Sequence, residues 1–165
     1  MKVIFKTIQD TITSKVAAVR WVDFDLGQLD AEKPPVSFPC ALVGFSSGEY
    51  AVIGQDSNVG LVTVEVALAF QLRERTHSKA SATFKDEALE HLDTVEAVRT
   101  ALSGLEGSTF KALDYLGFSN DRRADLRVWR LRFSCAHYPA APDSPFQPLP
   151  GGVDLDLCLH PDIVQ

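Results

Sequence analysis

The chain has 165 residues and a net charge of −6, a length that fits one domain with an ordinary hydrophobic core. The acidic balance argues against tight DNA or RNA binding, because proteins that contact many phosphates carry a basic surplus. The cysteines, Cys40, Cys135 and Cys158, have no CxxC spacing and indicate neither a zinc site nor a redox pair. No apolar run approaches the ~18 residues of a membrane span, so we expect a soluble protein made in a reducing cytoplasm.

The first third of the chain predicts a helix followed by strands and a loop. Apolar residues at four-residue intervals predict an amphipathic helix over residues 3–19. A short strand is expected over 21–25, and a loop with two prolines over 26–36. A buried strand over 39–45 follows, and the composition of 46–49 predicts a turn.

Residues 61–72 carry the clearest structural signal in the sequence. The apolar face consists of Val62, Val64, Val66, Leu68, Phe70 and Leu72, and the second face of Thr63, Glu65, Ala67, Ala69 and Gln71. Strict alternation over this length predicts a half-buried antiparallel strand. The second face is small and mildly polar, so we expect it to meet solvent or a neighbouring subunit.

The second half of the chain predicts one helix and a β-hairpin. The helix is expected over about 84–102, with a kink or break where Asp93 and Thr94 could cap a new segment. Strands are predicted over 110–118 and over 126–138. The turn between them makes the two strands a natural hairpin.

The order of these elements predicts an α+β fold. We expect a mostly antiparallel sheet with two or three helices packed on one face, formed by residues 1–138 as a single domain. Five prolines lie within residues 139–150, so residues 139–165 are expected to be an extended Pro-rich C-terminal arm. Near the end of this arm, over residues 153–159, apolar residues occupy alternate positions, and this stretch could add a strand to its own sheet or to that of a neighbouring copy.

Asp23, Asp25 and Glu65 form the most tempting acidic group. Two carboxylates on one strand face and a third on a neighbouring strand could hold Mg²⁺, as in metal-dependent nucleases. However, no lysine has the ExK spacing that would orient a water molecule there. A solvated surface is therefore the favoured interpretation of these acids.

No other motif indicates chemistry. The four histidines, His77, His91, His137 and His160, have no metal-ligand spacing. The nucleophile elbow GxSxG and the phosphate-binding glycine motifs do not occur. We therefore expect a non-enzyme with no catalytic residue, no metal ligand and no cofactor.

The only concentration of basic residues lies in the last predicted hairpin and comprises Arg122, Arg123, Arg127, Arg130 and Arg132. Arginines that alternate on a strand could face DNA or an acidic partner subunit. Pairing with surface Asp and Glu is favoured over DNA contact, and an intersubunit role lies between the two.

Several segments, taken with the element order, resemble small prophage-encoded tail proteins. These segments are WVDFD (21–25), GQL (27–29), PPVSFPCALV (34–43) and ALSGL (101–105). Together with the first helix, the long alternating strand and the final hairpin, they resemble the phage tail terminator family over residues 3–138 or so. The resemblance implies a ring, typically a homohexamer, that stops tail-tube polymerisation and offers a surface to the head. It implies no catalytic residues.

On this resemblance the chain would be a structural virion protein, a tail terminator or prophage minor tail protein. It would be found in the host cytoplasm during assembly and then in the virion tail. Its partners would be further copies of itself, the tail tube and head-completion proteins, without a membrane and without tight nucleic-acid binding. The acidic balance suits a ring around DNA, because like charge lets a duplex slide without sticking.

The contact elements expected in such a ring are the loops 26–36 and 73–82, the second face of 61–72 and the arm after residue 138. The candidate contact residues are Gln28, Leu29, Thr63, Glu65, Arg130 and Arg132. Two alternatives stay open: a small metal-dependent nuclease that uses the acidic group above, and a module that binds a peptide on an exposed strand edge.

Overall fold

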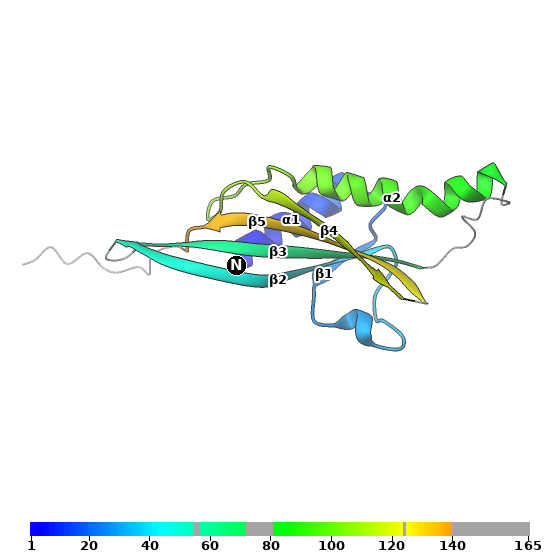
Figure 1. Ribbon diagram of the computed structural model, residues 1–165, viewed down its shortest axis with the longest axis horizontal. Coiled ribbons are helices and arrows are strands. Elements are labelled where there is room, and N and C mark those ends of the chain that lie inside the picture. The colour runs from blue at the N-terminus through cyan, green and yellow to red at the C-terminus, as the bar shows by residue number, and fades with distance from the viewer. Residues whose placement is uncertain (55–56, 72–80, 124, 140–165) are drawn as a thin grey trace, which may run out of the picture.

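A computed structural model describes residues 1–54, 57–71, 81–123 and 125–139 of the chain (Figure 1). The elements are α1 (Lys2–Lys15), β1 (Trp21–Phe24), the 3-10 helix η1 (Gln28–Asp30), β2 (Cys40–Gly54), β3 (Ser57–Gln71), α2 (Ala82–Leu102), β4 (Asp114–Arg122) and β5 (Leu126–His137). The α+β fold predicted from the sequence is confirmed. The expected loop over 73–81, but for Ser81, and the expected arm after Pro139 lie outside the described residues. Neither described α-helix is both long and apolar enough to cross a bilayer.

The five strands form one sheet in the order β1-β2-β3-β5-β4. β1 pairs with β2 in parallel, and every other pair is antiparallel. It follows that β1, β2 and β5 run in one direction and β3 and β4 in the other. The expectation of a mostly antiparallel sheet, with a final hairpin formed by β4 and β5, is confirmed.

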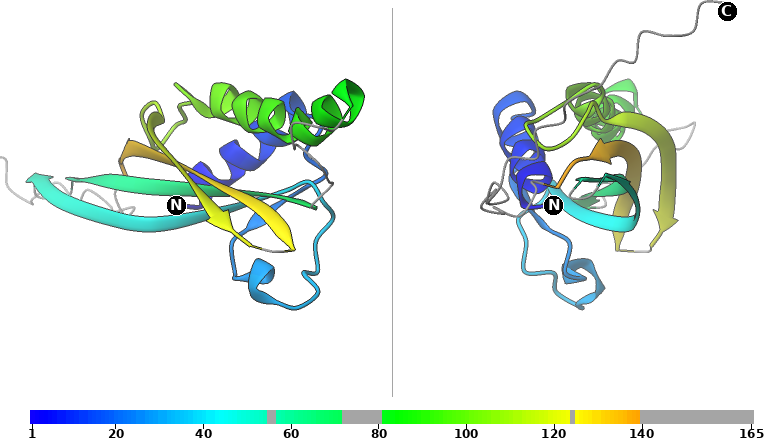
Figure 2. Two further views of the ribbon diagram at one scale, coloured as in Figure 1. Left: turned by 45° about the vertical axis from the view of Figure 1, so that its right-hand side comes forward. Right: turned by 90° about the vertical axis from the view of Figure 1, so that its left-hand side faces the viewer.

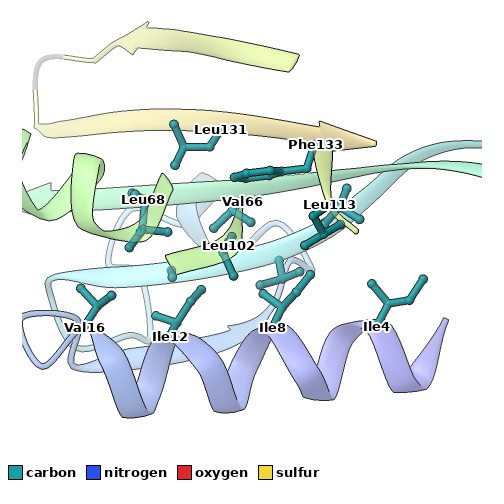
Figure 3. Packing of buried hydrophobic residues seen from close by; sticks show 14 of the residues in the cluster. Ile4, Ile8, Ile12, Val16, Val66, Leu68, Leu102, Leu113, Leu131 and Phe133 are labelled. Carbon is teal, nitrogen blue, oxygen red and sulfur yellow. The ribbon is translucent and has the colours of Figure 1, made fainter. Parts of the chain in front are cut away.

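Both α-helices pack on the same face of the sheet, which we call the inner face (Figure 2). The stripe Ile4, Ile8 and Ile12 of α1 is fully buried there (Figure 3). β-Branched residues are weak helix formers, so burial, at about 1.5–3 kcal/mol for each side chain, is what holds this helix in place. The sheet side chains that receive the helices include Val64, Val66, Leu68, Leu131 and Phe133.

The opposite, outer face of the sheet has a second and smaller apolar cluster. Residues 25–39, which we call the covering loop, lie beneath this face and include η1 (Figure 2). The cluster comprises Leu29, Cys40, Leu42, Ala67, Ala69, Leu126 and Val128, with Val36 and Phe38 packed against it. The expectation that the whole second face of β3 is open is therefore wrong, because Ala67 and Ala69 are 0% exposed beneath the chain's own loop.

Several predicted boundaries differ from the structure. The first helix ends at Lys15 rather than at residue 19, and β3 begins at Ser57 rather than at residue 61. The turn expected over 46–49 is wrong, since β2 continues to Gly54 and its pairing with β3 is interrupted in this stretch only by a bulge between Phe45 and Ser47. The break expected near Thr94 is also wrong, because α2 is one helix and the Thr94 hydroxyl donates to the carbonyl of Glu90 at 3.5 Å. The strand expected from residue 110 begins at Asp114.

The longer β2 produces a feature that the sequence prediction lacked. Figure 1 shows the paired ends of β2 and β3 running past both helices as a projecting ribbon. Residues 46–51 of β2 are all exposed, and among them Tyr50 is 49% exposed. From Ala51 on, β2 pairs with a part of β3 that no longer pairs with β5. A two-stranded ribbon alone is marginally stable in water, so this end of the sheet lacks the packing that supports the rest.

Candidate functional site

The open part of the outer face, between the covering loop and the projecting ribbon, holds a group of charged side chains from four different segments. Asp25 follows β1, Glu65 lies on β3, Asp121 on β4 and Arg130 on β5. Strand alternation brings their side chains to one face. Gly44 pairs with Glu65, and because it has no side chain the Asp25 carboxylate can reach across β2.

Arg130 is the centre of this group, which we call the Arg130 network. Its Nε donates to Asp121 Oδ2 at 2.7 Å, and its Nη1 donates to Glu65 Oε1 at 2.9 Å. Asp25 Oδ2 lies 3.8 Å from the same Nη1. The four side chains are between 25% and 38% exposed, so these are partly desolvated ion pairs rather than surface contacts. These ion pairs join the start of the covering loop to β3, β4 and β5.

The electrostatics of the network favour the charged guanidinium. Burial by itself lowers the pKa of Arg130, but the hydrogen bonds to Asp121 and Glu65 outweigh this effect and raise the pKa above its ordinary value. Three carboxylates around one guanidinium leave two uncompensated negative charges. Arg132, the nearest further cation on this face of β5, is exposed and has no ion pair within the described part of the chain.

Two members of the predicted acidic group do converge, but on an arginine. Asp25 and Glu65 both face Arg130, whereas an oxygen of Asp23 accepts the Phe24 amide at 2.8 Å. A guanidinium between these two carboxylates occupies the position that a divalent cation would need. Among the residues that the structure describes, no group of three or more His, Cys, Asp or Glu side chains is placed so that it could hold a metal ion.

The two described histidines are both engaged by their surroundings. The His91 ring lies near Phe70 and Trp129, with centroid distances of 5.6 and 6.4 Å, and its Nδ1 is 2.9 Å from the Ala88 carbonyl oxygen. Burial is the main reason that the pKa of His91 is lowered, and nearby Arg127 adds to this effect. His91 also lines a hollow of about 340 Å³ together with Arg20 and Arg127. His77 and His160 lie outside the described residues.

His137 is buried at the base of the projecting ribbon. Its Nδ1 is 3.0 Å from the Tyr50 hydroxyl, and its Nε2 is 3.2 Å from the Met1 nitrogen. Desolvation lowers the pKa of His137, with a further contribution from the N-terminal charge. The Tyr50 ring lies over Gly60, where an added Cβ would be 2.3 Å from Tyr50 Cε1. This contact ties β2 to β3 just where the ribbon leaves the helices.

The predicted contact residues have different environments. Gln28 is used inside the covering loop, where its Oε1 accepts the Leu26 amide and its Nε2 donates to the Phe24 carbonyl, both at 2.7 Å. Leu29 is only 5% exposed in the outer cluster. Thr63, Glu65 and Arg130 are half-buried and Arg132 is exposed. Contact of any of these residues with a second subunit stays a prediction.

Besides the outer edge of the four-residue β1, two longer strand edges have no strand partner among the described residues, and sequence reasoning identified neither of them. β1 covers only residues 40–43 of β2, so within the described chain the rest of that edge pairs with nothing. β4 is the other outer strand, and its edge facing away from β5 is likewise free among the described residues. The exposed side chains Leu116 and Phe118 lie on β4 and are 55% and 59% exposed.

Comparison with known proteins identifies a fold but no family. No protein-family model matches the sequence, and no curated protein matches it either. Among solved structures, the chain is similar to a chain in the virion of a native gene transfer agent particle. The TM-score is 0.51 at 14% sequence identity, and the match covers 83% of this chain and 96% of the other. At this identity the likeness shows a shared fold.

Proposed function

We propose that this chain is a structural protein of a phage-like particle and acts by self-association. The observation that carries the proposal is the fold likeness to a chain of a gene transfer agent virion, because the match covers 96% of that chain. The likeness therefore concerns the whole fold rather than a common substructure. The element order supports the finer proposal of a tail terminator, a ring that caps the tail tube and joins it to the head.

The surface of the chain is consistent with an assembly role. An exposed ribbon at 46–51, two free strand edges and exposed apolar side chains on β4 are features that a partner could cover. The charged group on the outer face is held by Arg130 within the chain, which argues against the nuclease alternative. In this proposal the chain has no catalytic role, and its net charge of −6 suits a ring through which DNA passes.

The proposed partners are further copies of this chain, a tail tube and head-completion proteins. The proposed location is the host cytoplasm during assembly and the particle tail afterwards. A ring needs a head-to-tail contact between two different surfaces of each copy, since a contact between identical surfaces closes after two copies. The sheet offers two different free edges that could serve as these surfaces.

The test is the assembly state of the purified full chain across a concentration series. We expect light scattering to give a mass that is a small whole multiple of the 18.1 kDa chain, and electron microscopy to show rings with an open centre. A chain that stays monomeric up to its solubility limit, with no rings in any field, would contradict the proposal.

A further inference from the structure

The free edges of β2 and β4 lie on opposite sides of one sheet, and each strand contains a regular stretch of six residues. β2 pairs with β3 without interruption over residues 47–52, and β4 pairs with β5 without interruption over residues 117–122. Each is a run of six residues in regular strand geometry, about the length of an ordinary strand. We propose that copies of this chain join through these edges, β4 of one copy adding to β2 of the next, an inference that rests on the proposed self-association.

The strand directions favour this junction. β4 runs opposite to β2 within the sheet, because one antiparallel step separates β2 from β3, a second β3 from β5, and a third β5 from β4. In a closed ring with rotational symmetry every copy has the same orientation relative to the axis. With the strands running along the ring axis, β4 of one copy meets β2 of its neighbour antiparallel, which is the pairing with the better hydrogen-bond geometry.

The side chains near these edges are unusually apolar for solvent-facing positions. On β4, Leu116 and Phe118 are 55% and 59% exposed, and on the ribbon Tyr50 and Leu61 are 49% and 59% exposed. Neither the exposed part of β2 nor β4 contains lysine or proline, the residues that most often protect a free edge. Pairing would cover this apolar surface and satisfy the unpaired backbone groups together.

The two edges also explain why the contact would lead to a ring rather than to a two-fold dimer. A dimer formed through β4 against β4 uses the same edge twice and leaves the exposed ribbon of β2 uncovered. Pairing between β4 and β2 uses both edges of every copy, and each copy then has one neighbour on each side. A second copy of this chain is thus the occupant that fits both edges at once.

The test uses disulfide formation between two separately purified variants, both in a Cys158→Ser background. Glu49 pairs with Leu61 and Ser119 with Arg130, so both side chains lie on the outer face near the middle of their free edges. Glu49→Cys protein is mixed with Ser119→Cys protein of different tagged mass, and the mixture is oxidised mildly. A parallel sample uses Ser47→Cys in place of Glu49→Cys, so that two registers of pairing between β2 and β4 of neighbouring copies are tested. Thr13→Cys on the exposed side of α1 is the matched control.

We expect a mixed disulfide between a β2 variant and the β4 variant, at least about tenfold more abundant than with the control, because a disulfide needs Cα atoms ~4.4–6.8 Å apart. A dominant disulfide between two copies of the Ser119→Cys variant would overturn the proposal in favour of a two-fold dimer. Rings that form normally without any mixed disulfide would overturn the edge contact while leaving the proposed function intact. A chain that forms no assembly at all would overturn both.

A second variant tests the contact without cysteines. Leu116→Glu puts a carboxylate at the β4 edge, where Leu116 is the unpaired bulge residue between Tyr115 and Gly117. We expect the association constant to fall about tenfold or more, because pairing would desolvate the charge. Leu89→Glu, on the exposed side of α2, is the control and should leave assembly unchanged. Equal effects of the two variants, in chains that circular dichroism shows to be folded, would count against the edge contact.

Discussion

Arg130 is the residue on which the open part of the outer face depends. It binds Asp121 and Glu65 directly and faces Asp25, so its loss would leave half-buried carboxylates without their cation. We expect Arg130→Met to lower the free energy of unfolding by about 1–3 kcal/mol in urea titrations at neutral pH. Arg132→Met, the same change two residues along the same face of β5, is the control. It should change stability by less than about 0.5 kcal/mol, and equal losses would contradict the network.

Gly60 is a position where the absence of a side chain has a structural reason. An added Cβ would lie 2.3 Å from the Tyr50 ring, so Gly60→Ala should displace that ring and weaken its contact with His137. We expect a loss of about 1 kcal/mol by thermal unfolding. Gly48→Ala on the opposite strand of the same ribbon meets only ordinary contacts of 3.5 Å or more. It should be neutral or slightly stabilising, and the cost of Gly60→Ala should shrink in a Tyr50→Ala background.

At the scale of single elements, periodicity in the sequence was a reliable guide and local composition was not. The stripe of α1 and the alternation of β3 predicted both elements, since burial on one face requires those spacings. The polar stretch 46–49 predicted a turn, yet pairing with β3 keeps it in β2. Thr94 predicted a new helix start, yet its hydroxyl bonds back to a carbonyl within an unbroken α2. Pairing with a neighbouring strand overrode the local preference in the first case, and a hydrogen bond one helical turn back accompanies the unbroken helix in the second.

His91 links α2 to the sheet, and its titration gives that contact a pH dependence. Its pKa is lowered by burial and by Arg127, so the unfolded chain binds more protons once the pH falls through the ordinary imidazole range. The contribution of His91 to the free energy of unfolding is therefore fully present above pH ~6.5 and is lost as the pH falls below that value. We expect the free energy of unfolding to decrease between pH ~7.5 and ~5.5.

His91→Phe is the variant that tests this link, because it keeps a ring against Phe70 and Trp129 without a titrating group. The decrease over the same pH range should be smaller in the variant. It should not vanish, since the pKa of His137 is also lowered by burial and contributes in the same direction. Identical pH profiles for the variant and the original chain would rule out a contribution from His91.

At the scale of the whole molecule, the sheet separates two apolar layers of unequal size. The inner layer joins α1 and α2 to the sheet, while the outer layer is a small cluster beneath the covering loop. The sequence predicted the inner layer because two helical stripes and a strand face share it. The sequence could not predict the outer layer, because alanines such as Ala67 and Ala69 are equally suited to solvent. Only the path of the covering loop decides whether they are buried. The sequence favoured pairing of Arg130 with Asp and Glu, and this prediction is confirmed. It could not name the partners, because they depend on the order of strands in the sheet rather than on spacing in the sequence.

The two layers should differ in stability, and one buried cysteine reports on each. Cys40 lies in the outer cluster and Cys135 in the inner one, at 0% and 2% exposed. Burial raises the pKa of the Cys40 thiol to about 11 and also raises that of Cys135, so neither forms a reactive thiolate in the closed protein. Alkylation therefore requires local opening of the protein.

In a Cys158→Ser background, we expect iodoacetamide to modify Cys40 at least about tenfold faster than Cys135, because a loop opens more easily than a sheet loses its helices. Peptide mass spectrometry follows the two alkylation rates. Leu29→Ala should loosen the covering loop and so increase the difference between the alkylation rates of Cys40 and Cys135. Ile8→Ala should raise both rates together. Equal rates at both cysteines would mean that the two layers unfold as one unit.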